Sequence, residues 1–305
     1  MSVSSPEASK EVRRFACTSC GHCCNRGPEM ELSEATALAG TFVTSLLFKV
    51  HSLPISDRSE WSGKWWRGRE SRIPLRPALE EAQRHLRRFA SRRIDNKRGR
   101  QVFLEISAIV DDDGQERCPA LAGNLCAIYE TRPLSCRTVP LHYSRAPSTL
   151  QTYLDRFAAT PGYRCDTTAA APAIVDGNKV LDPQIAADRE RAIALAKQDR
   201  RWKERLVAIM DDPAQAGAVG IPNYAAVLSN SDNGYATMLP MIVAWRVARD
   251  EGLLSDEELR DICRKQADLI RSRASAPKDA RDALAPYEFE LSKSASGGLI
   301  RSPAA

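Results

Sequence analysis

Apolar residues recur at helical spacing in two stretches of the chain, which predicts two amphipathic helices. The first covers residues 77–93 and leaves most of its arginines on other faces. The second opens at Ser255, where Glu258 completes a capping box, and runs to about Arg273. Cys263 falls on the apolar stripe of this helix and is therefore predicted to be a small buried side chain. The stripe consists of Leu259, Ile262, Cys263, Ala267 and Ile270.

Three further helices are predicted from their ends. Ser33 is expected to cap a short helix that reaches Ala39. Asp182 and Pro183 supply a cap and a first-turn proline for a helix that reaches about Met210. Residues 234–250 are expected to form another helix, bent at Pro240.

The remaining segments predict a strand, a turn and a linker. Residues 101–110 are rich in β-branched side chains and partly alternating, so they predict one strand of a small hairpin. The Asp-Asp-Asp-Gly run at 111–114 is typical of the turn that closes such a hairpin. Residues 167–178 have the alanine-, proline- and glycine-containing composition of a linker.

Length and composition predict a two-domain globular protein. The chain has 305 residues, of which 43% are hydrophobic and 27% charged. No apolar run reaches the roughly 18 residues of a membrane span. The first residues lack the apolar stretch of a secretory signal peptide, so we expect a cytoplasmic protein.

Cysteines are numerous and unevenly placed. Eight of the nine lie in the first 165 residues, and Cys263 stands alone. In a reducing cytosol such a cluster favours metal binding or redox chemistry over disulfides. We therefore expect an α+β protein in which an irregular cysteine-rich metal-binding domain with a small β-hairpin (1–170) precedes a mainly α-helical domain (180–275) and a mostly flexible tail (276–305).

A first cysteine array has the spacing C-x-x-C-x-x-C-C and consists of Cys17, Cys20, Cys23 and Cys24. Two-residue gaps let a tight turn direct successive sulfurs toward one centre, and Gly21 relieves the steric limits of such a turn. Iron–sulfur clusters use similar C-x-x-C-x-x-C runs. Because neighbouring side chains generally diverge, Cys23 and Cys24 could serve different centres.

A second array contains Cys118 in a CPAL string, and Cys126 and Cys136 in the block CAIYETRPLSCR. Together with Phe15 before the first array and Pro140 after the second, this pattern resembles the YkgJ-type cysteine-cluster family, whose C-x-x-C-x-x-C-C proteins are described as zinc- or iron-chelating. The resemblance covers about residues 15 to 170, and it leaves the helical C-terminal part unexplained.

The resemblance implies a set of metal ligands. Eight thiolates divide into two four-sulfur centres, and both zinc and an iron–sulfur cluster accept four cysteines. The array spacing leans slightly toward iron–sulfur, and His22 and His142 are possible substitutes for a misassigned sulfur. The implied ligands are Cys17, Cys20, Cys23, Cys24, Cys118, Cys126, Cys136 and Cys165, the last by a weaker local match.

Arginines accompany the cysteines along the chain. Zinc bound by four thiolates carries a formal charge of −2, which neighbouring guanidinium groups would stabilise. Arg26, Arg132 and Arg137 are therefore predicted to hold the cofactor. Ordinary solvated surface arginines are the alternative interpretation.

A basic insertion, residues 57–100, interrupts the cysteine-rich region. It holds fourteen Lys/Arg against six Asp/Glu and contains Trp61, Trp65 and Trp66, whereas the whole chain has a net charge of +5. Such a segment can bind nucleic acid or an acidic protein partner. The favoured interpretation is a solvated helix with a covering loop, without sequence-specific nucleic-acid binding.

These observations predict a metal-binding protein with a redox or metal-handling role. One alternative is an enzyme of methyl-transfer or oxidoreductase type, because the wider family is associated with a flagellin lysine methylase. The chain has neither a G-x-G-x-x-G nucleotide loop nor the C-x3-C-x2-C spacing of radical S-adenosylmethionine enzymes. A further alternative is a structural zinc module with a basic surface for nucleic acid or a protein partner.

Overall fold

The chain forms two compact units, each made of two separate stretches. The first unit comprises Met1–Cys24 and Ala120–Ile193, and the second comprises Asn25–Pro119 and Ala194–Ala305. Both helices and strands are present, as the predicted α+β class requires. The structure is a computed structural model that describes residues 12–24, 27–54, 62–65, 69–72, 75–97, 100–111, 117–229, 236–272 and 278–297.

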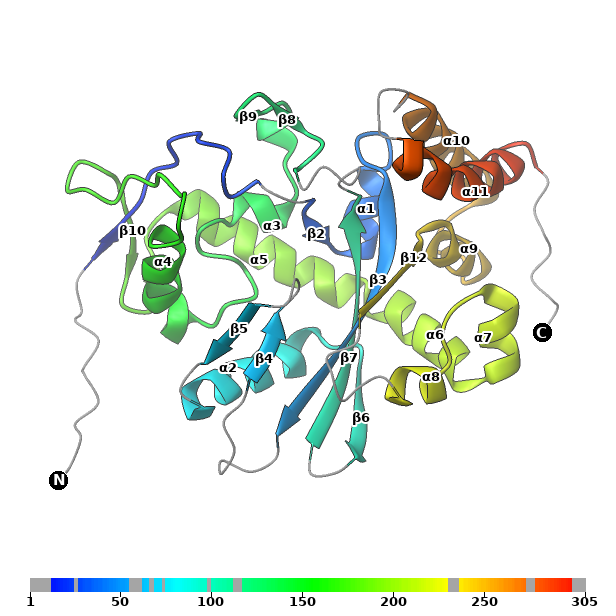
Figure 1. Ribbon diagram of the computed structural model, residues 1–305, viewed down its shortest axis with the longest axis horizontal. Helices are drawn as coiled ribbons and strands as arrows, with labels where there is room; N and C mark the ends of the chain where they lie inside the picture. Colours follow the sequence, from blue (N-terminus) through cyan, green and yellow to red (C-terminus); the bar gives the residue numbers. More distant parts are fainter. Residues whose placement is uncertain are drawn as a thin grey trace. The chain divides into compact units, whose positions relative to one another are not determined.

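The first unit contains a small antiparallel sheet. β1 (Arg13–Arg14), β10 (Ala173–Asp176) and β11 (Lys179–Val180) lie in the order β1–β10–β11 (Figure 1). β10 arises within the stretch that was expected to be a linker. Because Ile174 and Val175 are buried there, apolar packing outweighs the surrounding alanine and proline content, and the linker prediction is wrong.

An apolar core supports this sheet. α4 (Leu150–Ala158) contributes two of its residues, and α5 (Pro183–Gln198) begins in the same unit, where the Asp182 carboxylate accepts a hydrogen bond from the Ile185 N–H at 2.8 Å. The shorter elements are β8 (Leu121–Ala122), β9 (Leu125–Cys126), α3 (Leu134–Arg137) and the 3₁₀ turns η1 (Tyr129–Thr131) and η2 (Pro147–Thr149). The core consists of Phe15, Leu141, Leu150, Leu154, Ile174 and Val175.

The second unit contains the larger sheet. β12 (Ala236–Pro240), β3 (Thr44–Pro54), β7 (Arg100–Val110) and β2 (Glu29–Met30) lie in that order, and β6 (Arg92–Lys97) also pairs with β7. β3 and β7 are antiparallel over eleven residues, from Thr44 opposite Val110 to Pro54 opposite Arg100. The strand predicted over 101–110 is confirmed as β7, which pairs antiparallel with the preceding strand β6 as in a hairpin, but both strands belong to a five-stranded sheet.

The amphipathic helix predicted over 77–93 is confirmed as α2 (Leu75–Phe89). Leu86 packs against Leu53 of β3 and Phe103 of β7, which places the apolar stripe of α2 on the sheet (Figure 1). Three arginines lie on its exposed face, namely Arg84, Arg87 and Arg88. Within the basic insertion, β4 (Ser62–Trp65) and β5 (Arg69–Arg72) form a two-stranded sheet, while Trp61 and Trp66 lie outside the described residues.

The remaining helices of the second unit show where local patterns misled. The single helix expected over 234–250 is wrong, because residues 236–240 form strand β12, which pairs with β3, and helix α9 follows it. The predicted helix to Met210 breaks at Asp199, and α1 begins at Leu32 rather than after a Ser33 cap, with Glu31 in the cap position. These helices are α1 (Leu32–Ala37), α6 (Arg200–Asp211), α7 (Pro213–Val219), α8 (Tyr224–Ser229), α9 (Ile242–Asp250), α10 (Asp256–Ser272) and α11 (Lys278–Ala295).

α10 agrees closely with its prediction. The Ser255 N–H donates to the Glu258 carboxylate at 2.7 Å, and the Glu258 N–H donates to the Ser255 hydroxyl at 3.2 Å, so the capping box is confirmed. Cys263 is fully buried, as its place on the apolar stripe predicted. Burial raises the pKa of the Cys263 thiol to about 12, which keeps the thiol protonated and unreactive.

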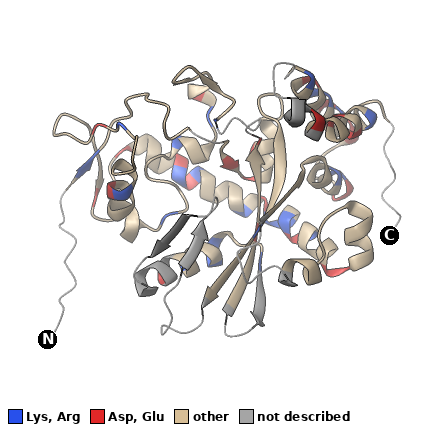
Figure 2. Cartoon of the chain, viewed as in Figure 1, with Lys and Arg blue, Asp and Glu red and all other residues tan. Residues whose placement is uncertain are grey.

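α11 occupies much of the segment that was expected to be a flexible tail. Tyr287 and Leu291 are buried, and Arg271 of α10 pairs with Glu288 of α11 at 2.6 Å. Charges of both signs cover the exposed faces of these two helices (Figure 2). The serine- and alanine-rich end of α11 gave a misleading signal, because tertiary packing fixes this helix. No helix in the described part of the chain has the length and apolarity that a membrane span requires.

Candidate metal centre

Two distant segments of the first unit meet at the cysteine loop. Ala16 and Asp166 exchange backbone hydrogen bonds of 2.8 and 3.1 Å, and Cys17 and Cys165 each adjoin one of these two residues. The Thr18 hydroxyl donates to the Arg164 carbonyl at 2.6 Å, which adds a second tie. The backbone therefore brings Cys165 beside the first cysteine array, although Cys17 and Cys165 are 148 positions apart in the chain.

The loop between Cys17 and Cys24 is tightly turned. Ser19 and Gly21 both adopt the left-handed region, with φ of 56° and 74°. A Cβ atom at Gly21 would lie 3.3 Å from the Asn124 Cα, so glycine also permits close contact with the turn between β8 and β9. The Ser19 N–H donates to the Cys17 sulfur at 3.4 Å, which begins an N–H···S pattern in the loop.

Charges in the first cysteine array influence the Cys165 thiol. Burial, followed by the charges of Cys23, Cys20 and Cys17, raises the pKa of Cys165 to about 11. In contrast, the backbone N–H groups of His22 and then Arg164 lower the pKa of Cys20 by stabilising its thiolate. Backbone donors of this kind are available to stabilise a sulfur that carries negative charge.

Cys23 and Cys24 lie in contact, with their sulfurs 3.9 Å apart. The hydrogen bond with Cys24 and then burial raise the pKa of Cys23, while the positive charge of Arg132 acts in the opposite direction. Arg132 is held by a 2.7 Å hydrogen bond from its Nε to the Tyr129 carbonyl and stacks on the Tyr129 ring. The charge of this guanidinium group thus acts on Cys23, and its role in holding a cofactor stays a prediction.

For the other predicted site residues, the described contacts do not include the first cysteine array. Cys126 ends β9 and Cys136 lies in α3, and both are partly buried in the first unit. Arg137 forms a 2.9 Å ion pair with the buried Asp188 of α5, so its charge is engaged there. Cys118 belongs to the second unit, and Arg26 and the turn expected at 111–114, apart from Asp111, lie outside the described residues.

The described contacts of the two histidine rings that were proposed as substitute ligands are with residues other than cysteine. The His142 Nδ1 lies 2.8 Å from the Ser144 hydroxyl and accepts a 3.3 Å hydrogen bond from the Ser144 N–H. The His22 ring lies beside Gly162, where an added Cβ would be 3.7 Å from Nδ1. Ser144 is thus a described neighbour of the His142 ring, and Gly162 is one of the His22 ring.

A polar cluster that the sequence pattern did not single out lies on the sheet of the second unit. Glu105 is 7% exposed, and its carboxylate pairs with Lys49 at 3.0 Å, with His51 at 2.8 Å and with His85 of α2 at 3.4 Å. Burial alone would raise the pKa of Glu105, but Lys49 and the two histidines lower it well below its usual range. The carboxylate thus remains ionised in the sheet.

Glu29 extends this cluster. Its carboxylate accepts hydrogen bonds from Lys49 at 2.5 Å and from the Ser107 hydroxyl at 2.7 Å. The sequence signal was polar residues at every second position beside apolar neighbours, Lys49 and His51 in β3 and Glu105 and Ser107 in β7. Pairing of two strands about fifty residues apart was needed to bring them together.

As placed, no three Cys, His, Asp or Glu side chains in the described stretches surround a common point as metal ligands would. The Ala16–Asp166 pairing brings Cys165 beside Cys17, and the Cys23 and Cys24 sulfurs lie in contact. Comparison with protein-family models, with curated proteins and with solved structures finds no match. The resemblance to the YkgJ-type family therefore stays a prediction from the sequence.

Proposed function

We propose that the first unit is a cysteine-ligated metal-binding module, holding zinc or an iron–sulfur cluster for a redox or metal-handling role. The observation that carries this proposal is the Ala16–Asp166 backbone pairing, which brings Cys165 beside the array that begins at Cys17. Four cysteines drawn from these two segments would supply the complete donor set of a zinc or iron–sulfur centre. A reducing compartment would keep them available for metal rather than for disulfides.

The surroundings of the cysteines support a charged centre. The Ser19 N–H donates to the Cys17 sulfur, and the His22 and Arg164 N–H groups stabilise the Cys20 thiolate. Arg132 adds a positive charge near Cys23. Backbone donors and a guanidinium group would together offset the negative charge of four thiolates on one metal.

Two observations favour different metals. The 3.9 Å separation of the Cys23 and Cys24 sulfurs is close to the edge of a zinc–thiolate tetrahedron, which is roughly 3.8 Å for bonds of about 2.3 Å. The side chains of adjacent residues usually diverge, so this short separation supports a zinc ion bound by both Cys23 and Cys24. The C-x-x-C-x-x-C spacing favours an iron–sulfur cluster instead.

Elemental analysis and the visible spectrum of anaerobically purified protein test the proposal. We expect about one or two equivalents of zinc without colour, or several irons with acid-labile sulfide and broad visible absorption. A spectrum that bleaches reversibly on reduction would favour the redox role, whereas a colourless zinc protein would favour a structural or metal-handling role. Purified protein without stoichiometric metal after anaerobic reconstitution would overturn the proposal.

Three alanine variants assign the ligands. Cys165→Ala and Cys126→Ala are each expected to lose metal from at least one centre, because each removes a thiolate from the first unit. Cys263→Ala is the matched control, since this buried cysteine lies on the apolar stripe of α10 and should retain the full metal content. Equal metal loss in all three variants would contradict the ligand assignment.

A further inference from the structure

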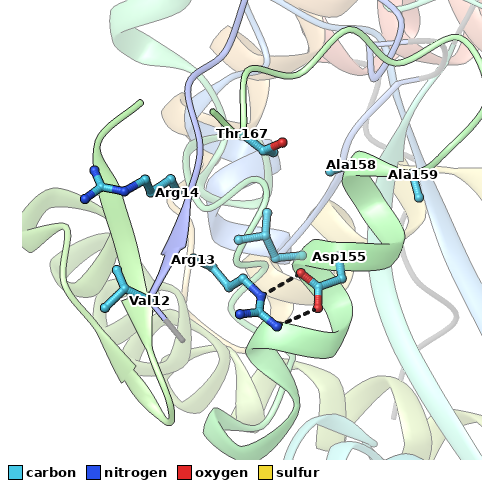
Figure 3. A pocket seen from close by; sticks show the side chains of 8 residues that line it. Val12, Arg13, Arg14, Asp155, Ala158, Ala159 and Thr167 are labelled. Carbon is cyan, nitrogen blue, oxygen red and sulfur yellow. Dashed lines mark hydrogen bonds and ion pairs between the residues drawn. The ribbon is translucent and has the colours of Figure 1, made fainter. Parts of the chain in front are cut away.

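A groove of about 590 Å³ lies on the first unit between β1 and α4 (Figure 3). The buried Leu154 lines it together with Ala158, whose small side chain leaves the space open. Arg13 crosses toward α4 and forms a two-point ion pair with Asp155, at 2.9 and 3.3 Å. The groove therefore has one wall made by a strand, one made by a helix, and an apolar patch between them.

The strand wall has an open edge. β1 is the terminal strand of its sheet, with β10 on one side, and the described residues place no strand along its other side. The Phe15 N–H donates to the Pro172 carbonyl on the β10 side, whereas Ala16 pairs with Asp166. Backbone groups alternate along a strand, so the N–H and C=O of Arg14 and Val12 are directed to the Ala16 side.

The Ala16–Asp166 pair already begins a strand along this edge. The chain then leaves the edge, because the Asp166 carboxylate accepts a 2.9 Å hydrogen bond from the Thr168 N–H and closes a local turn. Arg14 and Val12 lie on the same edge as Ala16, further toward the N-terminus, and both also line the groove. An extended peptide could continue the pairing there, as in other cases of strand addition.

Charge and side-chain direction indicate the kind of peptide. Arg13 is neutralised by Asp155, whereas the described contact of Arg14 is a 2.7 Å hydrogen bond to the neutral Ala171 carbonyl. Successive side chains of an added strand point to opposite faces, so one set would meet Arg14 and the other set would meet Leu154 and Ala158. Acidic residues alternating with small apolar residues fit both faces.

We propose that the edge of β1 beside this groove is a docking site for an extended acidic peptide segment of a partner protein. The peptide adds a strand along Arg14 and Val12, places carboxylates opposite Arg14 and packs apolar side chains toward α4. The proposal does not depend on metal binding, because every contact it uses lies outside the cysteines.

Fluorescence anisotropy with the full-length protein tests the site. The probe is a labelled eight-residue peptide in which glutamate and valine alternate, and the comparison peptide has lysine in place of glutamate. We expect saturable binding of the acidic peptide only. Arg14→Glu should weaken it at least about tenfold by reversing the charge. Val12→Pro should weaken it by a similar factor, because it removes an edge N–H and leaves both arginines in place.

Arg156→Glu is the control, since this exposed arginine belongs to α4 and does not line the groove. It should bind the acidic peptide within about twofold of the unchanged protein. Circular dichroism checks the fold of each variant, and Val12→Pro keeps the test valid if Arg14→Glu fails to fold. The proposal is overturned by absence of saturable binding, by equal binding of the lysine peptide, by unchanged binding in Val12→Pro, or by equal weakening in Arg156→Glu.

Discussion

Different interactions stabilise the interior of each of the two units. In the second unit, β3 and β7 pair over eleven residues, and fully buried Leu46, Phe48 and Ile106 lie on these strands. In the first unit, the strands are only two to four residues long. Residues 117–132, which span the point where the chain re-enters this unit, include no buried residue. The second unit is thus stabilised by apolar burial, whereas part of the first is not.

This difference indicates where a metal would matter. The first unit has its own apolar core around Phe15 and Leu154, so its sheet and α4 have ordinary packing. The loop at Cys17–Cys24 and the hairpin that ends at Cys126 depend instead on turns and hydrogen bonds. Metal binding acts as folding free energy where such packing is scarce. We therefore expect metal dependence to be local to these segments.

Metal removal should have the largest effect and tests the comparison directly. Chelation is expected to increase protease cleavage within residues 17–24 and 120–132 at least about tenfold, because their cross-link is lost. β3 and β7 should resist cleavage under the same conditions. Limited proteolysis with mass spectrometry, after elemental analysis has verified metal loss, measures both. Unchanged cleavage in the cysteine segments, or equal sensitivity in β3 and β7, would abolish the distinction.

Substitution of Glu105 tests the second unit. Glu105→Gln removes the carboxylate on which Lys49, His51 and His85 converge and should lower the free energy of unfolding by about 3 kcal/mol at pH 7. Chemical denaturation measures this change. Glu257→Gln is the control, because this exposed residue of α10 has no described ion pair and should change stability by less than about 0.5 kcal/mol.

The effect of Glu105→Gln should also depend on pH. The pKa of Glu105 is depressed in the folded protein, so its stabilisation is complete above the ordinary glutamate pKa of about 4.3. It is lost as the pH falls from there through the folded pKa. The stability difference between the variant and the unchanged protein should therefore shrink in acid. A difference that stays constant from pH 7 to pH 3 would show that Glu105 contributes through packing alone.

Loss of the α10 cap should have the smallest effect. Ser255→Ala removes the hydroxyl that accepts from the Glu258 N–H and should lower the free energy of unfolding by about 1 kcal/mol. Thermal denaturation measures it, with Ser272→Ala at the other end of α10 as the control. A change in metal content in either variant would be unexpected, because both residues lie in the second unit.

Local patterns predicted some elements correctly and failed for others. The Ser255–Glu258 cap and the stripe containing Cys263 depend on residues within a few turns of one another, so the sequence alone was sufficient. β10 and β12 depend instead on partners far along the chain, β1 and β3 respectively. Alanine, glycine and proline around both strands weakened the local signal, and long-range pairing decided their structure.

The same reasoning applies to the candidate centre. Spacing identified the first cysteine array, because its four members lie within eight residues. The position of Cys165 relied on a weaker resemblance, and the Ala16–Asp166 pairing brings it to the array. The cluster around Glu105 was not predicted, since it requires the register of β3 against β7 and the packing of α2 on both.

The interleaving of the two units along the chain restricts how this protein can be divided or recombined. The chain passes from one unit to the other after Cys24, Pro119 and Ile193. A fragment that ends near residue 170 would contain β1 without β10 and would contain β3 and β7 without β12. A cut at that point would therefore break both sheets at once, whereas a gene segment encoding residues 1–193 would keep every part of the first unit and one encoding residues 25–305 every part of the second.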